Sequence, residues 1–276
     1  MGPQAETAAV MACVAAACAV PGVFLVLRRQ VMVTDAISHV LLFGIVLAYF
    51  AVKDLMSPWL FAGATASGIL TVALVELLRS SNRVKEDAAI GLIFPALFSI
   101  ATILASLYLR DTHLDIDSVL LGHAEFASFD RVWGLPRGIV VLGGLFLLNA
   151  GLTGLFFKEL KLTAFDPLLA ASLGFVPVLM HYALMTIVSI TAVAAFDAVG
   201  PVLVVAFFAV PAATAYLVAD RLAVVIALSV AFAVGGGIAG TLIAFYFDTN
   251  IAGTVATTLG AVFASVLAVR SAGRAA

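Results

Sequence analysis

Residues 222–246 read LAVVIALSVAFAVGGGIAGTLIAFY, a run of 25 residues without a charged side chain. A helix of about 20 apolar residues is long enough to cross the hydrocarbon core of a bilayer. The middle of the run, AFAVGGGIAGT at 231–241, is dense in Gly and Ala, which let helix backbones approach closely in lipid. This stretch therefore predicts a membrane-spanning helix packed against other helices.

The composition extends this prediction to the whole chain of 276 residues. Hydrophobic residues make up 64% of it and charged residues 11%, and its mean hydropathy is +1.20. Soluble domains have about 25% charged residues, so most of this chain must face lipid or other helices. The net charge of −2 gives no indication of a nucleic-acid partner. Cys13 and Cys18 are five apart, about 140° around a helix, and are expected to be small buried side chains.

Apolar runs of similar length recur along the chain and predict an all-α, polytopic transmembrane bundle that forms one domain over residues 1–276. About nine spans are expected, at 7–27, 33–52, 58–79, 87–109, 136–157, 177–196, 198–219, 222–246 and 251–270. The two spans around Asp197 and Gly200 could instead form one bent element, which would leave eight spans and reverse one terminus. Asp197 is expected to N-cap the second of them.

Basic residues predict the orientation, because Lys and Arg concentrate on the cytoplasmic side. With the N-terminus outside, four of the 14 basic residues lie outside: Lys53, Arg110, Arg131 and Arg137. The other ten lie inside: Arg28, Arg29, Arg79, Arg83, Lys85, Lys158, Lys161, Arg221, Arg270 and Arg274. The opposite topology would invert this bias.

Two connections are longer than simple links, an outer one at 110–135 and a cytoplasmic one at 158–176. In the second, Asp166 occupies an N-cap position, Pro167 the first helical position, and Gly174 a helix end. These signals predict a short helix around Leu168 and Leu169. The helix is expected either to dock a partner protein or to rest on the lipid headgroups.

The chain has no motif for supplying its own energy. It contains no G-x-x-x-x-G-K-[ST] phosphate-binding loop, and no H-E-x-x-H zinc-protease motif. We therefore expect a transport subunit rather than an enzyme. Transport driven by a separate ATPase would explain the short cytoplasmic helix.

Residues 34–44, TDAISHVLLFG, place Asp35 and His39 four apart, on one face of a helix. A carboxylate and an imidazole at this spacing can share a divalent cation, and ionisable groups in spans often mark a substrate path. The alternative is a mutual hydrogen bond near the membrane surface. Two ligands are too few for a transported ion, but a twofold dimer would supply four.

Other polar residues are weaker candidates. His113, His123 and Glu125 lie in the outer connection, where they would form either a metal-collecting vestibule or an ordinary solvated loop. His181, near the start of a span, is expected to be a packing histidine. Glu76 is expected to pair with Arg79 one turn on.

The segment TDAISHVLLFG resembles the D-x-x-x-H segment of the permease subunits of bacterial zinc, manganese and iron(II) ABC importers. RVKEDAAIGLIFPALFSI, SVLLGHAEF, FDPLLAASLG, AVGPVLVVAFFAVPAATAYLVADR and YFDTNIAGTVATTLGAVF are similar to further segments of that family, in the same order. His123 departs from the acidic or amide residue that many members have at its position.

The resemblance implies a permease in the bacterial cytoplasmic (inner) membrane that moves Mn²⁺, Zn²⁺ or Fe²⁺ as substrate, with no permanently bound cofactor. Asp35 and His39 are then metal ligands, and 158–176 couples to the ATPase. The implied partners are two cytoplasmic ATPase subunits, a second permease (identical or a paralogue) and an extracytoplasmic metal-binding protein. A proton-driven secondary transporter, with the Asp–His pair as a proton relay, and a permease for siderophores or other chelates are the alternatives.

Overall fold

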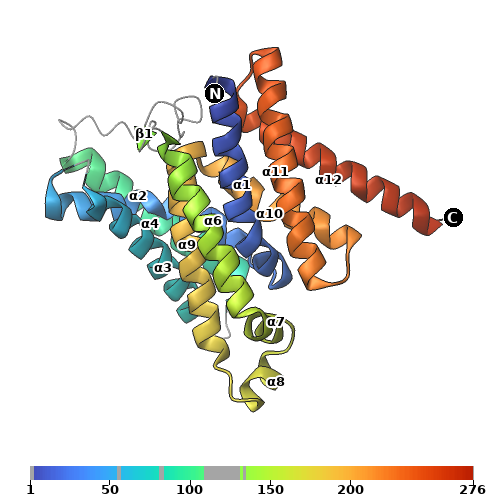
Figure 1. The fold of residues 1–276 in the computed structure, drawn as a ribbon. Coiled ribbons are helices and arrows are strands. Elements are labelled where there is room, and N and C mark those ends of the chain that lie inside the picture. The colour runs from blue at the N-terminus through green and yellow to red at the C-terminus, as the bar shows by residue number, and fades with distance from the viewer. Residues whose placement is uncertain (1–2, 55–56, 81–83, 109–130, 133–134, 276) are drawn as a thin grey trace.

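The computed structural model describes residues 3–54, 57–80, 84–108, 131–132 and 135–275. Long helices make up nearly all of these ranges, as predicted (Figure 1). The helices are α1 (Pro3–Leu27), α2 (Met32–Val52), α3 (Pro58–Ser80), α4 (Glu86–Tyr108), α6 (Arg137–Leu155), α7 (Phe157–Phe165), α8 (Pro167–Ser172), α9 (Pro177–Val199), α10 (Pro201–Val218), α11 (Leu222–Phe247) and α12 (Ile251–Ala275). Two short strands, β1 (Arg131–Val132) and β2 (Leu135–Pro136), pair antiparallel just before α6.

Nine helices in the described ranges are long and apolar enough to cross a membrane: α1 to α4, α6 and α9 to α12. This confirms the predicted bundle of about nine spans, with bounds shifted by only a few residues. The pair around Gly200 is two helices, not one bent element. Gly200 has φ +81°, a conformation that only glycine adopts readily, and this turn separates α9 from α10.

The prediction that Asp197 is an N-cap is wrong. Asp197 lies in the last turn of α9, which continues until the Gly200 amide donates to the Phe196 carbonyl. The residue before α10 is Gly200, which has no side chain to cap it. The sequence signal failed because α9 continues to Val199, three residues beyond the predicted end of the span at 196.

Helix α1 forms the centre of the bundle and is buried along most of its length. It packs against α6, α9, α10 and α11, whereas α2, α3 and α4 gather on one side and α12 extends away on the other (Figure 1). Helices α4, α6 and α12 are largely exposed, and their outer faces carry apolar side chains such as Leu107, Leu147 and Val269. Exposed apolar surface of this extent suits lipid or a second membrane protein.

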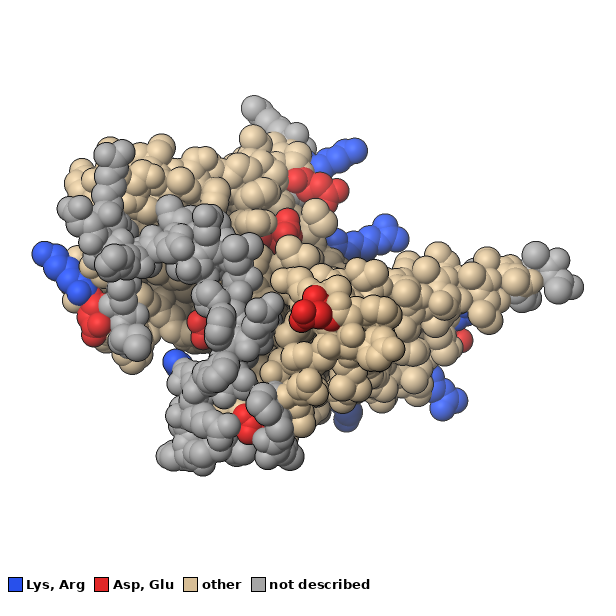
Figure 2. All heavy atoms as spheres, turned by 90° about the horizontal axis from the view of Figure 1, so that it is seen from above, with Lys and Arg blue, Asp and Glu red and all other residues tan. Residues whose placement is uncertain are grey.

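Small and polar residues hold the helices together, as is usual where lipid removes the hydrophobic driving force between them. The buried Asn149 amide on α6 donates to the Ala17 carbonyl of α1 at 3.0 Å and to the Thr191 hydroxyl of α9 at 2.9 Å. Charged side chains are few and scattered over the end of the molecule where the N-terminus lies (Figure 2). The predicted buried Cys18 is fully enclosed, and Cys13 is half-buried; both thiols are free.

Candidate metal site and coupling segment

The first two turns of α2 carry four polar side chains, which divide into two pairs. Thr34 and Ser38 are buried, and each hydroxyl donates to a backbone carbonyl: Thr34 to Val31 at 2.6 Å, and Ser38 to Thr34 at 2.8 Å. These two are therefore satisfied within the helix. Asp35 and His39 point to another face and remain partly accessible, and the carboxylate near the helix N-terminus is favoured by the helix dipole.

The predicted pair does lie together. His39 Nε2 is 3.5 Å from Asp35 Oδ1, and their side chains are 36% and 37% exposed. A good hydrogen bond between such groups is about 2.7–3.2 Å long, so the contact is loose for a direct bond. Two ligand atoms about 2.1 Å from a tetrahedral metal ion would lie about 3.4 Å apart. The separation is therefore long for a closed hydrogen bond and close to that of two ligands on one tetrahedral ion.

Aromatic rings from α4 orient the histidine. The His39 ring stacks on Phe94, with centroids 5.6 Å apart and an interplanar angle of 26°, and Phe98 meets it edge-on at 6.2 Å. Pro95 lies between them, inside α4, where its missing N–H interrupts the helical hydrogen bonding. These rings limit the rotation of the imidazole and shield one of its faces, so its open edge lies toward Asp35.

The two side chains do not make a complete metal site within one chain. Among the residues that the structure describes, no group of three or more His, Cys, Asp and Glu side chains is placed to hold an ion. The accessibility of the pair leaves room for ligands from another molecule or from water. The proposed vestibule residues His113, His123 and Glu125 lie outside the described ranges.

The predicted short helix in 158–176 is present as α8, with its predicted ends. The Asp166 carboxylate accepts a hydrogen bond from the Leu169 amide at 2.9 Å, and Pro167 is the first helical residue. Gly174 has φ +87°; its amide donates to the Ala171 carbonyl, and the Phe175 amide donates to the Ala170 carbonyl. This is the two-bond Schellman ending, so α8 is closed at both ends by its own sequence.

The segment holds a second helix that the sequence analysis missed. Helix α7 precedes α8 and buries Leu160 and Thr163, which are three residues apart on one face. That spacing in FKELKLTAF was the available signal. In α8, Ala170 is buried, while Leu168 is 84% exposed and Leu173 is 61% exposed. The segment therefore rests on the bundle through one face and presents leucines on the other.

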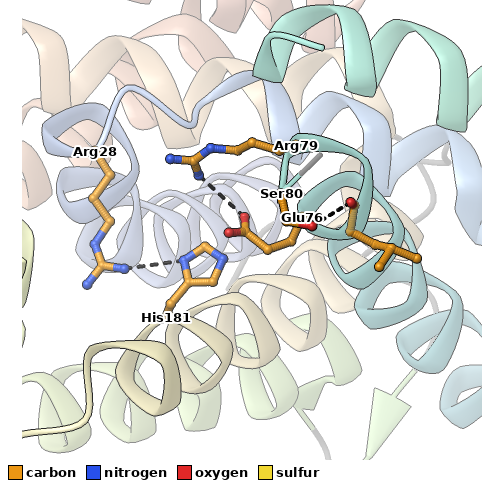
Figure 3. A network of polar contacts seen from close by, with 6 residues as sticks. Arg28, Glu76, Arg79, Ser80 and His181 are labelled. Atoms are coloured by element: carbon orange, nitrogen blue, oxygen red, sulfur yellow. Dashed lines mark hydrogen bonds and ion pairs between the residues drawn. The ribbon is translucent and has the colours of Figure 1, made fainter. Parts of the chain in front are cut away.

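A polar cluster joins the ends of four helices beside this segment, and Figure 3 shows its members that follow α1 or lie on α3 and α9. Arg28, just after α1, donates to the Thr163 hydroxyl of α7 at 3.1 Å and lies 3.4 Å from His181 Nδ1 of α9. The predicted Glu76–Arg79 pair on α3 is present at 3.3 Å and faces the same histidine. Sequence reasoning used Arg28 only as a topology marker, because nothing local links it to residues more than 130 positions away.

Taken together, these features define an integral, multi-pass membrane protein with a pair of short helices at one end, the second of them capped, and a carboxylate–imidazole pair on one of its spans. Residues 4–270 match the ABC 3 transport family, and the chain belongs to that family. The predicted family resemblance is thereby confirmed, and the chain is a membrane permease of the ABC transporter type.

Two curated relatives and one solved structure illustrate the similarity. The zinc transport system membrane protein TroD of Treponema pallidum is 48% identical over 265 residues, which cover 95% of this chain and 72% of TroD. The manganese transport system membrane protein MntD of Bacillus subtilis is 40% identical, covering 91% of this chain and 87% of MntD. The fold is also similar to that of PsaBC from Streptococcus pneumoniae in complex with a Fab, with a TM-score of 0.80, 27% identity, and coverage of 96% and 91%.

Proposed function

We propose that this permease imports a divalent transition metal, Mn²⁺ or Zn²⁺ and by extension Fe²⁺, driven by a separate ATPase, and that Asp35 and His39 line the metal's path. The single observation that carries the proposal is the 3.5 Å Asp35–His39 pair, held against Phe94 and left accessible. Carboxylate oxygen suits Mn²⁺, and imidazole nitrogen suits Zn²⁺, so the pair can accept either ion. The zinc and manganese named for the two relatives fit the same chemistry.

We place the path between two permease subunits, identical or paralogous. A transported ion exchanges its water for protein ligands, and two side chains supply too few. A second permease that brings its own pair to a twofold axis would provide two oxygen and two nitrogen ligands, a set that suits a four-coordinate ion. The accessible side of the pair is where that second subunit would face.

The other proposed partners are the ATPase subunits and a binding protein. Helix α8, with its exposed leucines, is the proposed docking element for the cytoplasmic ATPase subunits. An extracytoplasmic binding protein would deliver the metal at the opposite end. The excess of basic residues on the α8 side supports a cytoplasmic position for that side, with the permease in the inner membrane of a bacterium.

Membership of the ABC 3 family speaks against a proton-driven secondary transporter, since a separate ATPase then supplies the energy. A permease for metal chelates is less favoured, because both named relatives carry the name of an ion rather than of a chelate.

The test is uptake of radiolabelled Mn²⁺ and Zn²⁺ in cells that express the complete system with one altered permease. Asp35→Asn keeps the shape of the side chain but loses its charge, and His39→Gln loses the imidazole. Each should reduce uptake by about a hundredfold or more at equal membrane abundance, because loss of a ligand costs at least as much as the roughly 10–100-fold loss that follows removal of a group supporting one. Loss of His39 should reduce Zn²⁺ uptake more than Mn²⁺ uptake.

Asp197→Asn is the matched control, because Asp197 is an exposed carboxylate at a helix end far along the chain. It should leave uptake unchanged. Normal uptake by well-expressed Asp35→Asn and His39→Gln variants would leave the pair with a local structural role only.

A further inference from the structure

The side chain of Arg28 joins three parts of the chain that the proposed transport cycle must connect. It follows the last residue of α1 and donates to Thr163 of α7 at 3.1 Å. It also lies 3.4 Å from His181 Nδ1 at the start of α9 (Figure 3). Thr163 itself is buried and lies three residues before the N-cap of α8. Arg28 therefore attaches the coupling segment to the end of α1.

The turn after Arg28 leads directly into the helix that carries the metal pair. The Arg29 amide donates to the Val26 carbonyl and the Gln30 amide to the Leu25 carbonyl, with Arg29 at φ +59°. This is a two-bond helix ending with arginine where glycine is usual, and it is followed at once by the start of α2. Because the turn is so short, a displacement of Arg28 is passed to α2, in which Asp35 lies seven residues further along the chain.

The cationic side chain of Arg28 is poorly satisfied in this conformation. No described residue forms an ion pair with it, and its Nε is buried without a hydrogen-bond partner. Burial lowers the pKa of the guanidinium below its ordinary value, although arginine stays charged in proteins. In the same turn the buried Gln30 Oε1 also lacks a partner. Buried polar atoms are seldom left unpaired, so a turn with two of them is costly in this state.

We propose that Arg28 is a positioning residue that transmits movement of the coupling segment to the Asp35–His39 helix. When the ATPase subunits displace α8, α7 moves with it, and the Arg28–Thr163 hydrogen bond draws the α1–α2 turn along. Arg28 Nε and Gln30 Oε1 have no partners in the present conformation. A second conformation of the turn in which they form hydrogen bonds would therefore cost little free energy. This inference rests on the proposed function, since it assigns a route between the proposed ATPase dock and the proposed metal path.

A purely structural role and a transmitting role make different predictions for Arg28→Met. Methionine keeps much of the length of arginine, packs well and removes an unpaired charge, so the complex should unfold at the same temperature as the wild type or higher. The transmitted movement would be lost, and the metal ions transported per ATP hydrolysed should fall about tenfold, the size of a moderate coupling between two sites. Arg29→Met is the matched control. Arg29 is exposed, its side chain forms no ion pair with a described residue, and it carries the same charge one residue away.

The experiment uses the complete complex of permeases and ATPase subunits in proteoliposomes with the metal-loaded binding protein. Mn²⁺ and Zn²⁺ transport and ATP hydrolysis are measured in the same vesicles. Thr163→Val keeps the shape of Thr163 but removes the acceptor, so it should reduce the transport-to-ATP ratio as Arg28→Met does. The double variant should add no further loss, because both changes break the same contact.

Several outcomes would overturn the inference. The inference is wrong if Arg28→Met keeps the wild-type ratio of transport to ATP hydrolysis, or if Arg29→Met loses as much. It is also wrong if the loss in Arg28→Met appears only together with a lower unfolding temperature, or if the ATPase subunits dissociate from the Arg28→Met complex. A wild-type complex that moves neither ion on ATP would overturn the proposed function as well. If the wild-type complex transports the ions on ATP and Arg28→Met has the same ratio of transport to ATP hydrolysis, this inference alone is overturned and the proposed function stands.

Discussion

The imidazole of His39 on α2 stacks on the ring of Phe94 on α4, with 5.6 Å between centroids. A ligand whose ring is held in place loses less rotational freedom when it binds an ion. Groups that support a ligand without touching the ion therefore also affect metal affinity. The proposed metal pair on α2 would thus depend on α4, a helix to which the proposal assigns no ligand.

Replacing Phe94 by Ala should raise the metal concentration needed for half-maximal uptake about tenfold. It should not cause the near-complete loss of uptake expected from His39→Gln. Uptake measured over a range of Mn²⁺ and Zn²⁺ concentrations gives the half-saturating value. Leu92→Ala is the control, since Leu92 is an exposed apolar residue of the same helix. Equal effects of the two changes would mean that Phe94 does not support His39.

The contact between α2 and α3 depends on two glycines. A Cβ on Gly44 would collide with the Gly63 carbonyl and lie 2.6 Å from the Ser67 hydroxyl. Gly44→Ala should therefore destabilise the permease by about 1–3 kcal/mol, as overpacking does elsewhere. Gly91→Ala on α4 meets nothing within 4 Å and should be neutral. Thermal unfolding of the purified variants in detergent compares the two, and an unchanged Gly44→Ala midpoint would contradict the close approach.

Leu168 is the most exposed leucine of the coupling segment. Leu168→Glu should lower the metal-stimulated ATPase rate and transport together, because the proposed contact with the ATPase would lose an apolar anchor. Val218→Glu, at the end of α10, is a control of similar chemistry on an exposed residue. If Leu168→Glu keeps its full complement of ATPase subunits and its transport rate, α8 is an interfacial helix that rests on lipid headgroups.

The N-cap of α8 can be tested separately from its leucines. Asp166→Ala removes the acceptor for the Leu169 amide and should destabilise α8 locally by about 1 kcal/mol, whereas Asp166→Ser should retain most of the cap. Amide hydrogen exchange of residues 167–173 should accelerate in the alanine variant and leave the membrane helices unchanged. Acceleration throughout the bundle would show that the cap has more than a local effect.

Topology can be tested with single cysteines in a chain whose two native cysteines are replaced by alanine. Leu168→Cys on α8 should react with a membrane-impermeant thiol reagent only from the cytoplasmic side. Asp197→Cys, exposed in the last turn of α9, should react only from the outside. Reaction of both from the same side would contradict the nine-span arrangement and the cytoplasmic position of α8.

The predictable parts of this protein are those encoded by nearby residues. Apolar run length predicted the spans, and the spacing of Asp166, Pro167 and Gly174 predicted both ends of α8. The four-residue spacing of Asp35 and His39 predicted that they share a helix face. Each of these depends on contacts within one or two turns of helix.

Contacts between distant parts of the chain were not predictable in the same way. The stacking of Phe94 on His39 needs α2 and α4 to cross at one particular height, and the Arg28–Thr163 bond joins residues 135 positions apart. Helix α7 was missed because its polar and apolar residues alternate too evenly for a membrane span. Asp197 was misassigned because the residue that ends α9 is Gly200, three positions later.

The close approach of α2 and α3 has a mechanical consequence. Besides the close backbone approach at Gly44 and Gly63, the short Ser67 side chain of α3 donates a hydrogen bond to the Val40 carbonyl of α2 at 3.2 Å, so no long, flexible side chain separates the two helices there. Two helices in backbone contact slide poorly past one another, because neither has side chains there that can repack. If Asp35 and His39 line the proposed path, any movement of α2 around the ion would carry α3 with it, and the two helices would act as one rigid unit.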